Sequence, residues 1–291
     1  MKRHLLVAIS DDASALYGVR FVSSFFTDKQ RLNLTLYSSY PRGAEVWEEE
    51  KSFETLQHAE DHADRNEIRY RKVAEGARKR LVEAGFPTDS VEVRCTPRAH
   101  TKAMDIIQEG ERGLYDAVVL GRRAVAWLEH LLDESVSRQL LMDETGCPTW
   151  VCRHPEPGRT GVLLCLDGSE PAYRMADHVG FMLAGEPAHA VTMYHLLREG
   201  NGSQQDPREI FGRGRRILED NGLAPELITE KVAESSKTVK TILAEADQGG
   251  YAAVAVGRTG AGGSFLQRMF MGSVSHELLH HLEKAVLWFT R

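Results

Sequence analysis

The sequence predicts an α/β protein made of two tandem, doubly wound domains, each with a mostly parallel five-stranded sheet. Three observations predict it: the chain has 291 residues, short apolar segments alternate with amphipathic ones, and the second half nearly repeats the first. Strands that alternate with helices over short connections favour a parallel sheet covered on both faces. A chain of this length also suits two domains of about 150 residues.

Each half begins with a short apolar strand, a polar turn and an amphipathic helix. Residues 4–26 read HLLVAISDDASALYGVRFVSSFF, and residues 161–183 read GVLLCLDGSEPAYRMADHVGFML. A second strand is expected at 32–40 in the first half and at 189–197 in the second, because both segments are apolar and rich in strand-forming residues.

The remaining elements also occur twice. A basic helix with Gly near its end, as helix C termini prefer, is expected at 71–86 and at 208–223. The third strands are VEVRCTP and LITEKVA, and a further helix then leads into the fourth strands, YDAVVLGRR and YAAVAVGRT. Each half closes with a helix and a last apolar strand, CPTWVC at 147–152 and KAVLWF at 284–289.

We therefore predict domains at residues 1–153 and 160–291, joined by the Pro- and Gly-containing linker HPEPGRT at 154–160. The halves differ mainly at 43–70, a charged stretch with helix-forming composition. We interpret this stretch as a solvated helical extension of the first half, with a partner-binding helix as the alternative.

The composition excludes several classes of protein. Lys and Arg total 36 against 42 Asp and Glu, a net charge of −6, and no basic run could follow the phosphates of a duplex, so nucleic acid is not an expected partner. No apolar run approaches the ~18 residues of a membrane helix. Four cysteines without CxxC spacing, and an N-terminal apolar run too short for a signal peptide, predict a reduced, cytoplasmic protein.

A ligand site is expected at the carboxyl ends of the first and fourth strands, where the strand order of such a sheet reverses. Glycines there let backbone N–H groups approach a phosphate, and a helix N terminus attracts anions. In the second half the residues in question are Asp167-Gly168-Ser169, Gly257-Arg258-Thr259-Gly260, and Gly272-Ser273 at the next helix start.

With these residues the chain resembles the universal stress protein family, whose adenine nucleotide α-hydrolase-like, Rossmann-like domains bind ATP. In that family Gly-x2-Gly-x9-Gly-(Ser/Thr) after the fourth strand holds the ribose and phosphates, and an Asp after the first strand helps hold the nucleoside. The resemblance covers nearly the whole chain, twice, as in a tandem member. It implies an ATP site, with or without Mg²⁺, at Asp167, Gly257, Gly260, Gly272 and Ser273.

The spacing in the second half departs from that pattern. Eleven residues, not nine, separate Gly260 from Gly272, and the extra length lies in the bulge-forming segment 261–263. If Gly263 takes the place of Gly260 in the pattern, eight residues separate it from Gly272.

The first half keeps the spacing of the pattern but lacks the residue types that would bind a nucleotide. Ala124 stands where the second glycine is expected, and Glu134 places a negative charge where a phosphate would lie. Ser10 occupies the position of Asp167. We predict that this half does not bind nucleotide, so that the chain has one competent site.

Other motifs receive simpler interpretations. His276 and His280, in HELLH, have the spacing of a zinc protease, but a hydrolytic zinc needs a third ligand and only eleven residues follow, so no metal site is predicted. The glycine run lacks the Lys-Ser/Thr of a phosphate-binding P-loop and does not fit GxGxxG. Simpler roles stay open for two site residues: Ser273 as a helix cap and Asp167 as part of a turn.

The predicted function is an ATP-binding stress-response or regulatory protein, with no catalytic residues and at most slow ATP hydrolysis. One alternative is a nucleotide-independent interaction protein in which both sites are degenerate. Another is an ATP-using ligase or sulfurylase, whose SGGxDS or HIGH and KMSKS signatures are absent. The expected partner is an adenine nucleotide. The two halves are expected to pair through adjacent last strands as a pseudo-dimer, because an exposed strand edge is a liability, and a homo-oligomer is left open.

Overall fold

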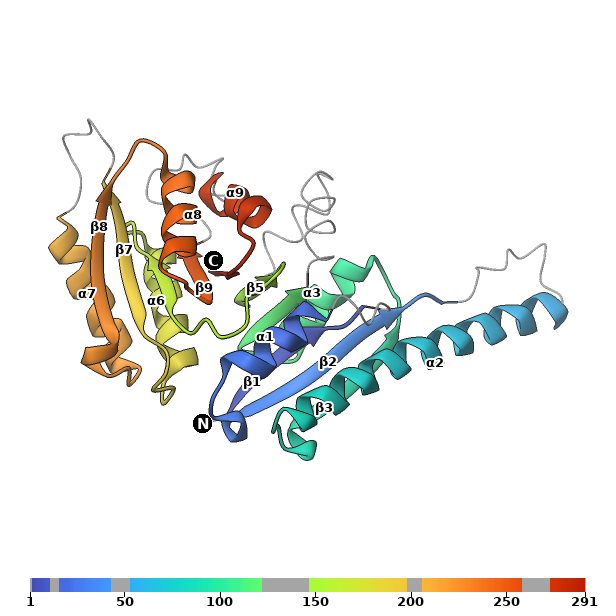
Figure 1. Cartoon of the computed structure of the whole chain (residues 1–291). Coiled ribbons are helices and arrows are strands. Elements are labelled where there is room, and N and C mark those ends of the chain that lie inside the picture. The colour runs from blue at the N-terminus through green and yellow to red at the C-terminus, as the bar shows by residue number, and fades with distance from the viewer. Residues whose placement is uncertain are drawn as a thin grey trace. The chain divides into compact units, whose positions relative to one another are not determined.

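The computed structural model describes residues 2–10, 16–42, 53–121, 147–197, 206–257 and 273–290 (Figure 1). The chain divides into two compact units. Unit 1 comprises Met1–Arg20 and Lys29–Leu141, and unit 2 comprises Phe21–Asp28 and Met142–Arg291. The domain boundaries at 153 and 160 stay a prediction, because they rest on the sequence repeat and not on compactness.

Unit 1 contains a parallel sheet with the strand order β3-β2-β1-β4. Its strands are β1 (Arg3–Ala8), β2 (Leu32–Tyr40), β3 (Val91–Pro97) and β4 (Ala117–Gly121). The helices of the first half are α1 (Tyr17–Phe25), α2 (Phe53–Glu83) and α3 (Lys102–Arg112), with short 3₁₀ turns at Lys29–Arg31 and Thr88–Ser90.

Unit 2 contains strands in the order β5-β10-β9-β6-β7-β8. They are β5 (Thr149–Cys152), β6 (Val162–Cys165), β7 (Val191–Leu197), β8 (Ile228–Glu234), β9 (Ala253–Gly257) and β10 (Val286–Thr290). Its helices are α6 (Glu170–Leu183), α7 (Pro207–Asp220), α8 (Thr238–Gln248) and α9 (Ser273–His281), with a 3₁₀ turn at Pro225–Leu227. Within unit 2, β10 pairs with β9, β9 with β6, β6 with β7 and β7 with β8 in parallel, whereas β5 pairs with β10 antiparallel.

The mostly parallel α/β fold is confirmed in both units, but the prediction of five strands in each sheet is not. The described strands number four in unit 1 and six in unit 2, because the last strand of the first half, β5, pairs with β10 of unit 2. The first and fourth strands of each half are neighbours, β1 with β4 and β6 with β9, so the strand order reverses between them as expected. Figure 1 shows α6 and α7 against one face of the unit 2 sheet and α8 and α9 against the other. The central strands are buried on both faces, with Leu163 and Val254 fully inaccessible, as parallel strands covered by two helix layers must be.

Of the charged stretch 43–70, residues 53–70 lie in the described part of the chain and are helical, as predicted. They form the beginning of α2, a single helix of 31 residues. The later part of α2 places Tyr70, Ala74, Ala77 and Leu81 in the core at intervals of four, three and four residues, which is the spacing of one helical face. In the earlier part, most of the positions whose side chains are described, residue 57 and residues 60–69, are exposed.

An aromatic cluster joins the two last strands inside unit 2. Trp150 of β5 and Trp288 of β10 lie directly opposite each other in the antiparallel register, and their rings stack with centroids 4.0 Å apart. Trp150 Nε1 donates a hydrogen bond of 3.0 Å to His178 Nε2 of α6. The expected adjacency of the segments 147–152 and 284–289 is therefore confirmed, while the pseudo-dimer of the two halves stays a prediction.

The segment Phe21–Asp28 belongs to this cluster although it precedes the rest of unit 2 in sequence. Phe25 packs edge-on against Trp288 and stacks on His189, and its carbonyl lies 2.6 Å from His189 Nε2. The buried carboxylate of Glu186 accepts hydrogen bonds from the backbone N–H and the hydroxyl of Thr27. These contacts tie an early segment of the chain to the loop after α6.

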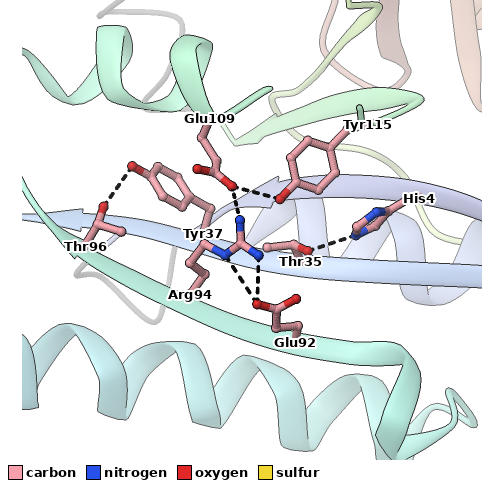
Figure 2. Close-up of polar contacts among 8 residues, drawn as sticks. All are labelled: His4, Thr35, Tyr37, Glu92, Arg94, Thr96, Glu109 and Tyr115. Atoms are coloured by element: carbon pink, nitrogen blue, oxygen red, sulfur yellow. Dashed lines mark hydrogen bonds and ion pairs between the residues drawn. The ribbon is translucent and has the colours of Figure 1, made fainter. Parts of the chain in front are cut away.

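A polar network connects α3 to the sheet of unit 1 (Figure 2). Glu109 of α3 accepts hydrogen bonds from Arg94 of β3 and from Tyr115, which precedes β4. Arg94 also contacts Glu92, 3.0 Å away. Burial raises the pKa of Tyr115 to about 12, so its hydroxyl remains a hydrogen-bond donor at neutral pH.

Unit 2 has a corresponding network, in which Lys231 replaces Arg94 and Thr229 stands at the position of Glu92. Glu245 of α8 accepts hydrogen bonds from Lys231 of β8 at 2.6 Å and from Tyr251 at 3.2 Å. The strand register makes the positions equivalent, because Arg94 lies opposite Tyr37 in unit 1 and Lys231 lies opposite Tyr194 in unit 2. The sequence repeat is thus also a repeat of side-chain contacts.

Candidate functional site

Two turns meet at the carboxyl edge of the unit 2 sheet. Asp167-Gly168-Ser169 follows β6, and Gly257 ends the neighbouring strand β9. Because the two strands are paired and parallel, both turns lie at the same edge. This is the edge at which ligands bind in open α/β sheets.

Asp167 forms the turn that leads into α6. Its Oδ1 accepts hydrogen bonds from the backbone N–H of Ser169 at 3.0 Å and from the Ser169 hydroxyl at 2.6 Å. Gly168 between them has φ +82°, a conformation that favours glycine. Ser169 then caps α6 by accepting from the N–H of Ala172. The Asp167 carboxylate is thereby held in one place on the exposed surface of the edge.

Gly257 has a steric reason to be glycine. A Cβ atom at this position would lie 2.7 Å from the backbone nitrogen of Ala172 and 2.8 Å from the carbonyl carbon of Pro171. Both atoms belong to the first turn of α6, so the missing side chain lets this turn pack directly on the end of β9. The sequence predicted a glycine that admits a phosphate, and the structure adds a packing role that the sequence did not reveal.

The first turn of α9 contacts the same residue. The hydroxyl of Ser275 donates a hydrogen bond of 3.1 Å to the carbonyl oxygen of Gly257. The N-terminal turns of α6 and α9 therefore converge on one strand end. Helix N termini carry free N–H groups and a partial positive charge, so this arrangement favours an anion.

One acidic side chain near this edge is neutralised. Glu170, the first residue of α6, forms a two-fold hydrogen-bonded ion pair with Arg213 of α7, at 2.6 and 2.8 Å. The hydrogen bond from Arg213 lowers the pKa of Glu170, which therefore stays charged and paired at neutral pH. The Arg213 guanidinium also lies over the ring of Tyr173, 3.9 Å from its centroid. Such a paired carboxylate repels an incoming anion less than an unpaired one would.

The described residues cover part of the predicted ATP site. Asp167, Gly257 and the helix start at Ser273 lie where they were predicted, while Gly260 and Gly272 lie within 258–272, outside the described residues, as does the side chain of Ser273. The roles of these five residues as nucleotide ligands stay a prediction.

In the first half the strand register supports the predicted alignment. Leu5 pairs with Ala117, and Val162 pairs with Ala253, so Ser10 occupies the position of Asp167. Ala124, Glu134 and Ser135 fall in the range 122–146, which is outside the described residues.

Sequence reasoning missed His195 of β7. This buried side chain has its Nδ1 2.7 Å from the carbonyl oxygen of Leu166, the residue before Asp167. Nδ1 must carry the proton to make this bond, and Nε2 has no hydrogen-bond partner in the described part of the chain. In unit 1 the hydroxyl of Ser38 donates to the equivalent carbonyl, that of Ile9, at 3.1 Å. Aligning the two halves residue by residue would have revealed the shared position.

The two histidines of the zinc-protease motif lie on one helix. His276 and His280 are on α9 as expected, but within the described residues no group of three His, Cys, Asp or Glu side chains is arranged to hold a metal ion. In the same described segments, no helix is both long and apolar enough to cross a membrane.

Comparison with known proteins agrees with the fold. A model of the family described as "Universal stress protein family" matches residues 159–289. A solved universal stress protein from Archaeoglobus fulgidus is 14% identical with a TM-score of 0.61, and the alignment covers 99% of this chain and 96% of that one. A functionally unknown protein from Pseudomonas aeruginosa is 14% identical with a TM-score of 0.50, over 99% and 92% of the two chains.

A universal stress protein in complex with cAMP is 16% identical with a TM-score of 0.36, over 45% of this chain and 96% of that one. Among curated proteins no sequence matches significantly. At these identities the Archaeoglobus fulgidus and Pseudomonas aeruginosa structures support the fold alone, each over nearly the whole of this chain.

Proposed function

Residues 159–289 belong to the universal stress protein family, and from this premise we propose that the second half of the chain binds ATP at the carboxyl edge of β6 and β9. The protein would act as a nucleotide-responsive stress or regulatory protein, with no catalytic residue assigned. The nucleotide, with or without Mg²⁺, would be held by Asp167, Gly257, Gly260, Gly272 and Ser273.

The observation that carries the proposal is the convergence of two helix N termini on Gly257. The α6 turn packs where a Cβ would be, and Ser275 of α9 bonds the Gly257 carbonyl. The positive ends of two helix dipoles at one edge can stabilise the charge of a polyphosphate without a basic side chain. The exposed Asp167 carboxylate lies at this same edge, and a carboxylate is a suitable acceptor for ribose hydroxyl groups.

We propose a single site per chain. In the first half Glu134 would stand at the helix start that corresponds to Gly272. Two unit charges about 4 Å apart repel by roughly 4 kcal/mol at an effective dielectric constant of 20, which lowers an affinity by about three powers of ten.

A nucleotide-independent interaction protein is the second candidate, and one observation favours it. Gly257 and Asp167 both have complete structural roles without any ligand: Gly257 admits the first turn of α6, and Asp167 holds its own turn through Ser169. Their presence is therefore compatible with a site that no longer binds nucleotide.

Calorimetric titration with ATP and with AMP separates the candidates. We expect the wild type to bind one ATP per chain, and we expect Gly272→Glu to lower the affinity by about a thousandfold, since it introduces the first half's charge. Glu134→Gly serves as the matched variant in the first half and should leave the second-half affinity unchanged. Two sites in the wild type, or an unchanged affinity in Gly272→Glu, would refute the single-site proposal. No binding by the wild type would favour the interaction protein.

A further inference from the structure

The exposed face of α9 carries two histidines one helical turn apart. His276 and His280 have their ring centroids 4.5 Å apart, and their Nε2 atoms are 3.4 Å apart. The spacing of four residues places both side chains on one face of the helix. His276 is exposed and His280 is partly exposed, so a small ion can reach the pair from solvent.

This separation is the one that a metal ion imposes on two imidazole ligands. Zinc–nitrogen bonds of about 2.0–2.1 Å and a tetrahedral angle put two ligand nitrogens about 3.3 Å apart. The Nε2 atoms, at 3.4 Å, already have this separation, so binding the same ion requires the two rings to rotate but not to move apart. The alternative, a hydrogen bond between the two rings, would be at the long limit for a nitrogen donor and therefore weak.

We propose that His276 and His280 form a two-ligand surface site for a late first-row divalent ion such as Zn²⁺, Cu²⁺ or Ni²⁺. Imidazole nitrogen suits these ions, whereas Mg²⁺ and Ca²⁺ require oxygen ligands. Water completes the coordination, because no third protein ligand is in place among the described residues. The site shares no residue with the proposed nucleotide site.

Metal binding at this site is coupled to the fold of α9. The two nitrogens are close together only when residues 276–280 are helical, so the ion binds the folded helix in preference to the unfolded chain. Any ligand with this preference raises the free energy of unfolding by an amount that grows with its concentration relative to the dissociation constant. The helix so stabilised begins at Ser273 and bonds Gly257 through Ser275.

The test uses the full chain, freed of metal with EDTA and titrated calorimetrically with Zn²⁺ near pH 7.5. His276→Gln and His280→Gln should each lower the affinity of one site at least about tenfold, because the second ligand then no longer binds intramolecularly. The double variant should lose at least as much affinity as either single one. His281→Gln is the matched control, since it is the next residue on the same helix, is exposed, and has its ring centroid 6.4 Å from that of His280. It should retain the affinity within about threefold.

Thermal unfolding gives a second readout. Zinc should raise the melting temperature of the wild type and of His281→Gln, and should raise that of the two site variants less, while all four melt alike in EDTA. The proposal would be overturned if His276→Gln kept the wild-type affinity for zinc. It would also be overturned if His281→Gln lost as much affinity as the two site variants.

A spectroscopic measurement on the wild type avoids the effect of any substitution on folding. One equivalent of Cu²⁺ should show nitrogen hyperfine splitting from two imidazoles in its electron paramagnetic resonance spectrum. A spectrum with one nitrogen or none would overturn the proposal.

Discussion

Replacing Gly257 by alanine should destabilise unit 2, because the new methyl group meets backbone atoms. The Cβ would be 2.7 Å from Ala172 N and 2.8 Å from Pro171 C, and a third atom, Pro171 Cβ, is 3.0 Å away. Carbon atoms in contact prefer separations of about 3.5–4.0 Å, so the first turn of α6 must move by several tenths of an ångström. That turn cannot yield as a flexible side chain would, since it is capped by Ser169 and leads into a buried helix.

Overpacking of this kind costs typically about 1–3 kcal/mol. We expect Gly257→Ala to lower the free energy of unfolding by that amount, measured by urea denaturation followed by tryptophan fluorescence. The same substitution should weaken ATP binding, because it separates the α6 turn from the end of β9. This second effect depends on the proposed nucleotide site, whereas the loss of stability does not.

Gly212→Ala is the matched control. Gly212 lies inside α7 of the same unit, and a Cβ there would have no atom within 4 Å. Alanine is the better helix former by about 0.5–1 kcal/mol, so this variant should be at least as stable as the wild type. Equal stabilities for Gly257→Ala and the wild type would refute the argument that the glycine is required by helix packing.

Three further predictions concern the described contacts. His195→Ser should preserve most of the stability, because Ser38 bonds the equivalent carbonyl in unit 1, whereas His195→Ala should cost about 1–3 kcal/mol in urea denaturation by leaving the Leu166 carbonyl unpaired. Burial lowers the pKa of His178 to about 3, so the folded protein keeps this ring neutral while the unfolded chain protonates near 6.5. Its contribution to stability is therefore complete above pH 6.5 and is lost as the pH falls toward 3, by up to about 1.4 kcal/mol per unit, and His178→Gln should flatten the measured pH dependence over that range. Tyr115→Phe and Tyr251→Phe should each cost about 0.5–1.5 kcal/mol through the lost hydrogen bond to the helix glutamate, and a loss in only one unit would contradict the equivalence of the two networks.

The fold was predictable because its signals are local. The repeated strand, turn and helix patterns identify β6, the Asp167 turn and the Ser169 cap without knowledge of any distant contact. The position of the helix start at Ser273 followed from the Gly-Ser pair in the same way. These features depend on residues within one or two turns of each other.

The features that the sequence did not reveal depend on distant partners. The packing role of Gly257 depends on atoms of Pro171 and Ala172, which only the fold brings against it. His195 has no motif around it, since its partner is a backbone carbonyl on another strand. The antiparallel register places Trp150 opposite Trp288. The hydrophobic pattern of either strand does not determine this register.

The early segment Phe21–Asp28 has a consequence for synthesis on the ribosome. Thr27 and its partner Glu186 are 159 residues apart, and Phe25 also packs against Trp288 near the end of the chain. Contacts between such distant residues form slowly, and apolar surface exposed in the meantime is prone to association. Phe25 and Phe26, both buried in the finished protein, cannot be fully covered before Trp150, His189 and Trp288 have been synthesised. The nascent chain therefore carries an exposed aromatic segment while the residues between Phe26 and these partners are made.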